Sequence, residues 1–234
     1  MKSIIYYTDN ILSGPIYSVV QRYLLSAGLP IISSSLRPIA FGDNEVVEGE
    51  RGYPTMVNQI ISCLERSTSK YVFFCEHDVL YHKSHFDFMP ERDDIFYYNE
   101  NGWRWLFGSK IAIRHDRMIP LSSLCVNREF ALAHYKMRAK KIKENGWDKL
   151  SGGDQKWVRK MGYEPGTKKK KRGGITNDDF ETWKSAFPII DIRHNNTFSP
   201  TKIKLEDFKH EPKWWIKTPI GEILGWELKN IFNL

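Results

Sequence analysis

The chain has 234 residues, 41% of them hydrophobic, and a formal net charge of +7. This composition excludes disordered and fibrous proteins, and the positive charge is compatible with an anionic partner. The three cysteines are widely spaced and odd in number, which fits neither a disulfide framework nor a zinc-binding pattern. The amino-terminal apolar stretch is too short for a signal peptide, and no apolar run is long enough to cross a bilayer. We therefore expect a cytoplasmic protein with one main domain.

The first third of the chain alternates strands and helices. Short β-prone apolar stretches predict strands, and apolar residues at helical spacing predict helices. In chain order these are a strand over 3–8, a helix over 16–27, a strand over 30–35, a helix over 55–66 and a strand from Tyr71. The polar, glycine-containing stretch 37–51 predicts a loop. This order predicts an α/β fold with a three-layer, mostly parallel sheet.

The pattern continues more weakly toward the carboxyl terminus. Further elements are predicted as strands over 95–99 and 104–113, a helix over 128–142, a short helix from Gly152 and a final strand over 188–192. From residue 213 onward, aromatic and apolar residues predict a partly amphipathic helix that packs on the core or on a second protomer, the latter giving a homo-oligomer. The alternative is that this helix lies on a membrane surface. We therefore divide the chain into a main domain over 1–198 and an aromatic-rich helical tail over 199–234.

The most informative stretch is the strand from Tyr71, which ends in Glu76, His77 and Asp78. The carboxyl ends of parallel strands open into the ligand crevice of an α/β sheet, so acidic groups are useful there. On a straight strand Glu76 and Asp78 would point to one face, with His77 opposite. Two carboxylates on one face suit a hard divalent cation that also holds phosphate oxygens. The alternative is a turn at the strand end whose acids only meet solvent.

Four ordered features resemble the nucleotide-sugar-dependent glycosyltransferases of the GT-A fold. They are the first strand ending in Thr8-Asp9-Asn10, the helix before Tyr71, the motif Glu76-His77-Asp78 in the place of the family's D-x-D, and the late His194. The stretches 76–82 and 191–196 are also similar to little-described bacterial and phage proteins of that superfamily. The resemblance covers roughly residues 1–198 and departs from the family pattern in having Glu as the first acid.

The resemblance implies roles for individual residues. It implies Asp78 and His194 as ligands of Mn²⁺ or Mg²⁺, which would neutralise the leaving diphosphate of a donor, with a UDP-sugar as the expected donor. Glu76 would ligate the metal through water or orient the donor, and His77 would mainly shape the turn. The remaining donor-binding residues implied are Thr8, Asp9 and Asn10 near the base and ribose, and Arg37 near the base or phosphates.

The candidate base that deprotonates the acceptor hydroxyl is Asp154, in Gly152-Gly153-Asp154-Gln155. Flanking glycines let the backbone approach an acceptor closely, and inverting enzymes of the resembled fold place a carboxylate at a helix start in this part of the chain. The equal alternative is an N-cap aspartate that holds the short helix. Asp178 and Asp179 are weaker candidates, and we expect them to cap a segment over 180–185.

The sequence does not decide whether the acceptor is a glycan or hydroxymethylated phage DNA. A phage-encoded protein would act in the host cytoplasm. For DNA, the basic clusters over 136–143 and 168–172 would contact phosphates, and the second, framed by Pro and Gly, predicts a loop. One alternative function is a metal-dependent hydrolase or nuclease built on residues 76–78 with His85 and Asp87. Another is a non-catalytic nucleic-acid-binding module.

Overall fold

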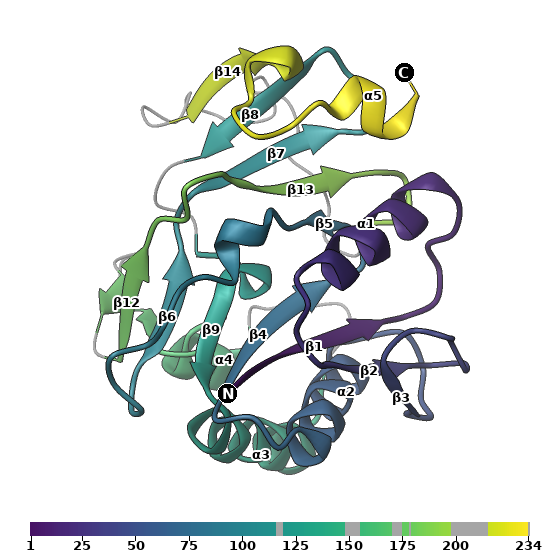
Figure 1. The fold of residues 1–234 in the computed structure, drawn as a ribbon. Coiled ribbons are helices and arrows are strands. Elements are labelled where there is room, and N and C mark those ends of the chain that lie inside the picture. The colour runs from purple at the N-terminus through teal and green to yellow at the C-terminus, as the bar shows by residue number, and fades with distance from the viewer. Residues whose placement is uncertain (116–118, 148–154, 170–174, 178, 198–214, 234) are drawn as a thin grey trace.

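The computed structural model describes residues 1–115, 119–147, 155–169, 175–177, 179–197 and 215–233 (Figure 1). Within these ranges a large sheet has seven strands. Their spatial order is β12 (Phe180–Trp183), β6 (Phe96–Asn99), β9 (Leu124–Asn127), β4 (Tyr71–Glu76), β1 (Lys2–Thr8), β2 (Ile31–Ser35) and β3 (Asp43–Val46).

The large sheet is mostly parallel. β1 pairs in parallel with β2 and β4, β2 with β3, and β12 with β6, while β9 runs antiparallel to both of its neighbours. The register places Tyr7 opposite Glu76 and Thr8 opposite Ser35. The carboxyl ends of β1, β2 and β4 therefore meet at one edge, which is the edge where an α/β sheet binds ligands.

Helices cover both faces of this sheet. They are α1 (Pro15–Ser26), α2 (Tyr53–Arg66), α3 (Arg128–Asn145), α4 (Lys156–Met161) and α5 (Leu228–Phe232). Along β4, Val72 and Phe74 pack with α2 and α3, whereas Phe73 and Cys75 pack with α1. Figure 1 shows α2 and α3 on one side of the sheet and α1 on the other. The predicted three-layer α/β fold with a mostly parallel sheet is confirmed.

A second sheet covers the α1 side at the carboxyl end of β4. In the described ranges its strand order is β14 (Trp215–Pro219), β8 (Ile111–His115), β7 (Gly102–Leu106), β13 (Ile189–Arg193) and β5 (Val79–Leu80). β5 follows β4 after a two-residue turn and pairs antiparallel with β13. The backbone amide of Ile192 donates to the carbonyl of Asp78 at 2.8 Å. This pairing brings the late histidine next to the acidic turn.

Three sequence predictions about individual elements are wrong. The expected loop over 37–51 contains β3, an edge strand that is held by hydrogen bonds from the Asn44 amide to the hydroxyls of Ser33 and Ser35. The segment after Asp179 is β12 rather than a capped segment, because it pairs in parallel with β6. The strand over 188–192 is not the last one, since β14 follows it.

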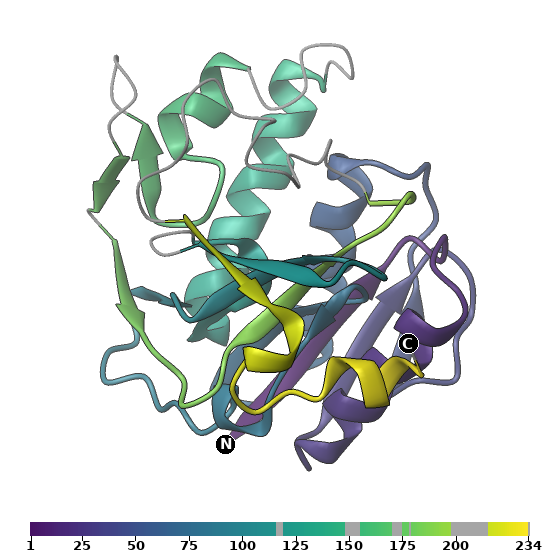
Figure 2. The ribbon, with the colours of Figure 1, turned by 90° about the horizontal axis from the view of Figure 1, so that it is seen from above.

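The tail is also not a single helix. Over 215–233 the chain forms β14, a 3₁₀ turn (Ile220–Glu222) and the short α5, because Pro219 and Gly225 interrupt a longer helix. Trp226 donates from its indole nitrogen to the carbonyl of Pro188 at 2.8 Å. Its buried apolar residues join the core around α1, and the view from above shows this yellow segment beside α1 (Figure 2). The expected packing of the tail on the protein's own core is therefore present in the described range 215–233.

None of the helices in the described ranges combines the length and hydropathy needed to cross a bilayer.

Two histidines, the buried His85 and the half-buried His134, predict how stability responds to acid. Burial lowers the pKa of His85 and of His134 to about 3, and the charge of Arg138 contributes to the shift at His134. In the unfolded chain a histidine has a pKa of about 6.5. The unfolded state therefore binds more protons below that pH, so the stability that each neutral histidine provides is lost as pH falls through about 6.5.

We predict that His134→Gln becomes more stable relative to the wild type by about 1 kcal/mol between pH 7 and pH 5.5. The measurement is urea unfolding of both proteins at the two pH values with a chelator present. The comparison with the wild type is necessary because burial raises the pKa of Glu76 to about 8 and of Glu164 to about 7, which acts in the opposite direction. A difference between the two proteins that does not change with pH would contradict the prediction.

Candidate functional site

The chain does not continue straight after Glu76, as the sequence analysis assumed. β4 ends at Glu76, and His77 and Asp78 form a turn before β5 begins. The hydroxyl of Tyr7 donates to Oε1 of Glu76 at 2.9 Å, which holds this carboxyl group on the side of α2 and α3. Asp78 instead approaches His194, which follows β13. The two acids therefore do not form the expected pair on one face.

A cluster of His77, Asp78 and His194 forms at the turn. One ligand atom from each of the three residues lies within 4.8 Å of the other two. Oδ2 of Asp78 is 3.5 Å from Nε2 of His194, which is too long for a well-formed hydrogen bond. Nδ1 of His77 and Nε2 of His194 are buried and have no hydrogen-bond partner among the described residues. Buried polar atoms without partners are costly, so these two nitrogens are suited to bind a ligand.

The donor set of this cluster fits a divalent cation. Two imidazole nitrogens and one carboxylate suit ions that accept mixed nitrogen and oxygen ligands, whereas Mg²⁺ takes oxygen ligands almost exclusively. The residues therefore fit Mn²⁺ better than Mg²⁺. His77, which the sequence analysis expected only to shape the turn, lies among the potential ligands.

The two acids at the turn have opposite charge preferences. Burial and the nearby charge of Asp78 raise the pKa of Glu76 to about 8, so its carboxyl group is mostly protonated at neutral pH. Burial also acts to raise the pKa of Asp78, but His194, His77 and Arg193 together bring that pKa below its ordinary value. Asp78 is therefore the ionised carboxylate that a cation meets.

A network of two arginines and one aspartate lies beside the cluster. Nε of Arg104 on β7 is 3.1 Å from Oδ2 of Asp191, and Nη2 of Arg193 is 2.6 Å from the same oxygen. These three side chains are only 10–15% exposed. Burial raises the pKa of Asp191 although both arginines act to lower it. Nε of Arg193 is buried without a hydrogen-bond partner in the described part of the chain. Two guanidinium groups thus contact one carboxylate beside the cluster.

The end of β1 carries the predicted nucleotide residues. Asn10 has a positive φ of 57°, and its side-chain oxygen accepts from the amides of Leu36 and Arg37 at 2.7 and 3.0 Å. The guanidinium of Arg37 donates back to the carbonyl of Asn10 at 3.0 Å. Thr8 is buried, and its hydroxyl accepts from the amide of Asn10 at 3.1 Å. The structure therefore brings Asn10 and Arg37 together and gives Thr8 a supporting position beneath them.

Arg51 connects the two sheets at this edge. Its Nε lies 2.5 Å from Oδ2 of Asp9, and its Nη2 donates to the carbonyl of Asn196 at 2.8 Å. Asn196 belongs to the turn after β13, and its amide donates to Nδ1 of His194 at 3.2 Å. The predicted nucleotide residue Asp9 and the predicted metal ligand His194 are thus linked through one side chain.

The candidate base Asp154 lies outside the described residues, as do Asp178 and residues 170–172 of the second basic cluster. Within the described residues, four lysines of the two basic clusters pair with acidic side chains. These pairs are Lys136 with Glu65 at 2.7 Å, Lys140 and Lys141 with Glu144 at 3.8 and 2.9 Å, and Lys168 with Asp179 at 3.8 Å. Lys168 lies on β10 (Thr167–Lys169), which pairs with β11 (Ile175–Asn177), so the predicted loop begins and ends in strands. These ion pairs do not support binding of DNA phosphates by the lysines.

The extra residues of the hydrolase alternative are not at the cluster. His85 is fully buried, and its Nδ1 lies 3.0 Å from the amide nitrogen of Asn99. Its ring packs among aromatic side chains of the core, including Phe73 and Trp183. Asp87 is exposed at the surface. A second metal therefore has no ligands from these two residues.

Sequence reasoning missed the arginines that line the site. Arg193 directly precedes His194 and lies on the same short strand as Asp191, so its position was available from the strand pattern. Arg104 carries no local signal, because it reaches the site only through a contact between distant segments. Arg51 could be expected from the sequence to reach the donor, although a structural role was the favoured interpretation.

No family model and no curated protein matches the sequence. Several solved structures share part of the fold. The bifunctional IspDF from Campylobacter jejuni is 13% identical with a TM-score of 0.37, over 57% of this chain and 42% of that chain. A glycosyltransferase involved in the glycosylation of the major capsid of PBCV-1 is 10% identical with a TM-score of 0.44, over 78% and 81%. HddC from Yersinia pseudotuberculosis is 11% identical with a TM-score of 0.40, over 82% and 93%. Likenesses at this level carry no argument about activity.

We predict that Mn²⁺ binds the wild type and that Asp78→Asn or His194→Gln weakens this binding at least about tenfold, because each change removes a ligand atom. Isothermal titration calorimetry with MnCl₂ measures the affinity. Glu76→Gln is the matched control, since Glu76 is already mostly protonated and faces Tyr7 rather than the cluster. Equal losses in Asp78→Asn and Glu76→Gln would show that the cluster is not the binding site.

Proposed function

We propose that the protein is a metal-dependent glycosyltransferase that moves a sugar from a nucleoside-diphosphate sugar, with UDP as the expected nucleotide, to an acceptor hydroxyl. One observation carries the proposal: a cluster suited to a divalent cation lies beside a buried pair of arginines at the carboxyl edge of parallel strands. A cation and guanidinium groups together recognise a diphosphate through charge and directed hydrogen bonds.

The charged groups around the cluster suit such a ligand. Asp78 has a lowered pKa, and Arg104 and Arg193 both contact the carboxylate of Asp191. A divalent cation beside guanidinium groups attracts the roughly two negative charges that the diphosphate of a nucleotide sugar carries near neutral pH.

The residues of the cluster and its neighbours would have distinct roles in this reaction. Asp78, His194 and His77 would hold the cation, which supplies neutralisation of the charge that develops on the leaving diphosphate. Arg193 and Arg104 would donate hydrogen bonds to oxygens of this diphosphate from the positions that their contacts with Asp191 give them. A preorganised donor in a site that excludes water stabilises developing charge more strongly than water does.

The nucleoside would lie along the end of β1. Asp9, Asn10 and Arg37 surround this edge, where Asn10 fixes the loop that carries Arg37. Thr8 supports the turn from below. Glu76, in its protonated form, is a hydrogen-bond donor that can orient the ribose or the transferred sugar.

Asp154 remains the proposed base for the acceptor. In direct displacement, the acceptor oxygen forms a bond to the anomeric carbon while the bond from that carbon to the diphosphate breaks. The hydroxyl proton passes to the carboxylate, and the configuration of the anomeric carbon inverts. A glycan is the acceptor that we propose, since four lysines of the basic clusters, Lys136, Lys140, Lys141 and Lys168, pair with acids.

We predict that UDP or a UDP-sugar together with Mn²⁺ raises the melting temperature by about 5–10 °C at a concentration one hundred times its dissociation constant. Asp78→Asn should lose this increase because the cation that holds the diphosphate is no longer bound. Differential scanning fluorimetry over a panel of nucleoside diphosphates and nucleotide sugars, with and without Mn²⁺, measures the shift. Asp87→Asn, a change at an exposed aspartate away from the cluster, should behave as the wild type.

Three results would reject the proposal. One is the absence of any shift with every nucleotide and metal tested. Another is release of free sugar or of cut nucleic acid at a rate that no acceptor increases, which would favour a hydrolase. The third is duplex DNA binding that persists unchanged in Asp78→Asn without any transfer activity, which would favour a binding module.

A further inference from the structure

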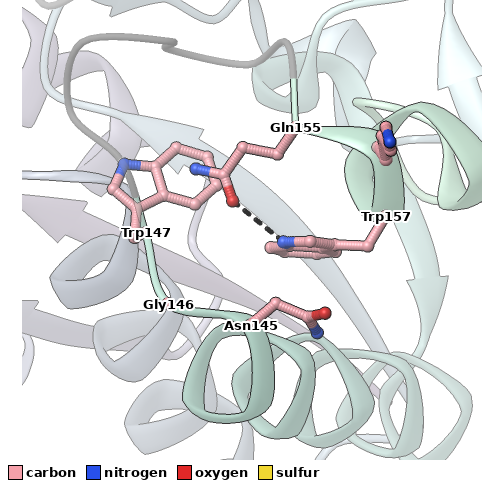
Figure 3. Close-up of a pocket in the computed structure, with 6 residues that line it drawn as sticks. Asn145, Gly146, Trp147, Gln155 and Trp157 are labelled. Carbon is pink, nitrogen blue, oxygen red and sulfur yellow. Dashed lines mark hydrogen bonds between the residues drawn. The ribbon is translucent and has the colours of Figure 1, made fainter.

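A hollow of about 550 Å³ lies between the end of α3 and the start of α4, on residues that the reaction above does not use. Its lining consists of Asn145, Gly146, Trp147, Gln155, Lys156 and Trp157. Figure 3 shows the two indole rings and the amide groups of Asn145 and Gln155 gathered around it. Its size lies within the range of sites for small molecules, and indole rings with a few amide groups are the kind of lining that such sites use.

Both indole rings are held in place before any ligand arrives. Trp147 stacks on Tyr53 with ring centroids 4.4 Å apart and planes at 20°. The indole nitrogen of Trp157 donates to Oε1 of Gln155 at 2.9 Å, as the dashed line in Figure 3 shows. Both tryptophans are half-buried, so each keeps contact with solvent. Fixed aromatic rings lose little conformational entropy when a ligand binds.

The arrangement of the rings favours one ligand chemistry. The centroids of Trp147 and Trp157 are 6.1 Å apart and their planes meet at 68°. Rings at this angle cannot clamp a flat nucleobase on both of its faces. A sugar ring is not flat: it presents apolar C–H groups on one face, which pack on the electron-rich face of an indole, and hydroxyl groups at its edge.

The polar groups of the hollow also favour a sugar as the ligand. Asn145 donates from its amide nitrogen to the carbonyl of Lys141 at 2.8 Å, which orients its side-chain oxygen as an acceptor. Gln155 adds a second neutral polar side chain and holds the ring of Trp157. Among the described lining residues, only Lys156 is charged. Neutral polar groups beside aromatic rings suit the hydroxyl groups of a carbohydrate.

We infer that this hollow, called the tryptophan hollow below, binds a neutral sugar ring of the acceptor glycan. Its role as an acceptor site rests on the proposed function, whereas the binding of sugar does not. Two features of the chain connect the tryptophan hollow to the candidate site. Tyr53, which supports Trp147, lies two residues after Arg51, which contacts Asp9 and Asn196. Gln155 directly follows the proposed base in the sequence.

The helices around the tryptophan hollow are tied to the same framework. Arg138 of α3 donates to the hydroxyl of Tyr53 at 2.8 Å and to the carbonyl of Gly162, after α4, at 2.9 Å. One buried guanidinium thus joins α2, α3 and the segment after α4. A sugar in the tryptophan hollow would therefore be held at a fixed place relative to the start of α2, next to Arg51 and its contacts with Asp9 and Asn196.

The test measures carbohydrate binding directly. Wild-type protein is titrated, by ligand-observed NMR and by tryptophan fluorescence, with methyl glucoside, methyl galactoside, lactose, cellobiose and chitobiose. We expect binding of at least one of these sugars and roughly tenfold weaker binding in Trp157→Ala, because the ring face is lost. Trp157→Phe should restore most of the affinity since it retains an aromatic face. Lys156→Ala should bind as the wild type because the ligand is neutral.

The shift in melting temperature with UDP and Mn²⁺ is recorded for every variant to separate this inference from the proposed function. We expect that shift to be the same in Trp157→Ala as in the wild type. If no nucleotide binds while sugar binding still depends on Trp157, the proposed function fails and the sugar site stands. If Trp157→Ala does not fold, Trp147→Phe and Gln155→Ala replace it, with weaker binding expected for Gln155→Ala.

Three outcomes would overturn the inference. The first is that none of the sugars binds the wild type. The second is that Trp157→Ala, or Gln155→Ala in its place, binds sugar as well as the wild type does. The third is binding of single-stranded or duplex DNA that is lost in both Trp157→Ala and Lys156→Ala, which would make the tryptophan hollow a nucleic-acid site.

Discussion

The site depends on the antiparallel pairing of β5 with β13. The hydrogen bond from the amide of Ile192 to the carbonyl of Asp78 docks the second sheet against the end of β4. This pairing places His194 beside Asp78 and brings Arg193 close enough to act on the pKa of Asp78. Without it, the acidic turn would lack the contact with His194 and the nearby guanidinium of Arg193.

Burial and unmatched charge occur together at this place. Nitrogens of His77, His194 and Arg193 are buried without hydrogen-bond partners in the described part of the chain, and Arg104 shares Asp191 with Arg193. Desolvated polar groups of this kind reduce the stability of the free protein. The same groups are preorganised for a cation and an anionic ligand, which would satisfy them together. The local instability and the proposed binding therefore have a common cause.

The sequence predicts the elements that local patterns define, and it fails where a distant contact decides. Apart from β3, the order of strands and helices up to Glu76 is right because apolar spacing and turn residues determine it. β3 and β12 were missed because each is a short edge strand that exists through pairing with a neighbour. The tail was taken for one helix although its apolar residues alternate between a strand and turns. His77 and Arg104 join the site only because the chain turns after β4 and the second sheet folds back over it.

The bridge made by Arg51 between Asp9 and Asn196 has a consequence for synthesis of the protein. Its two contacts join the residue after β1 to the turn after β13, so they cannot form until the chain up to residue 196 has left the ribosome. Contacts between segments so far apart in the sequence form late and slowly in folding. A nascent chain that already holds the paired β1, β2 and β4 would consequently still lack the cluster of His77, Asp78 and His194. Formation of this cluster would report completed folding rather than the folding of the first strands.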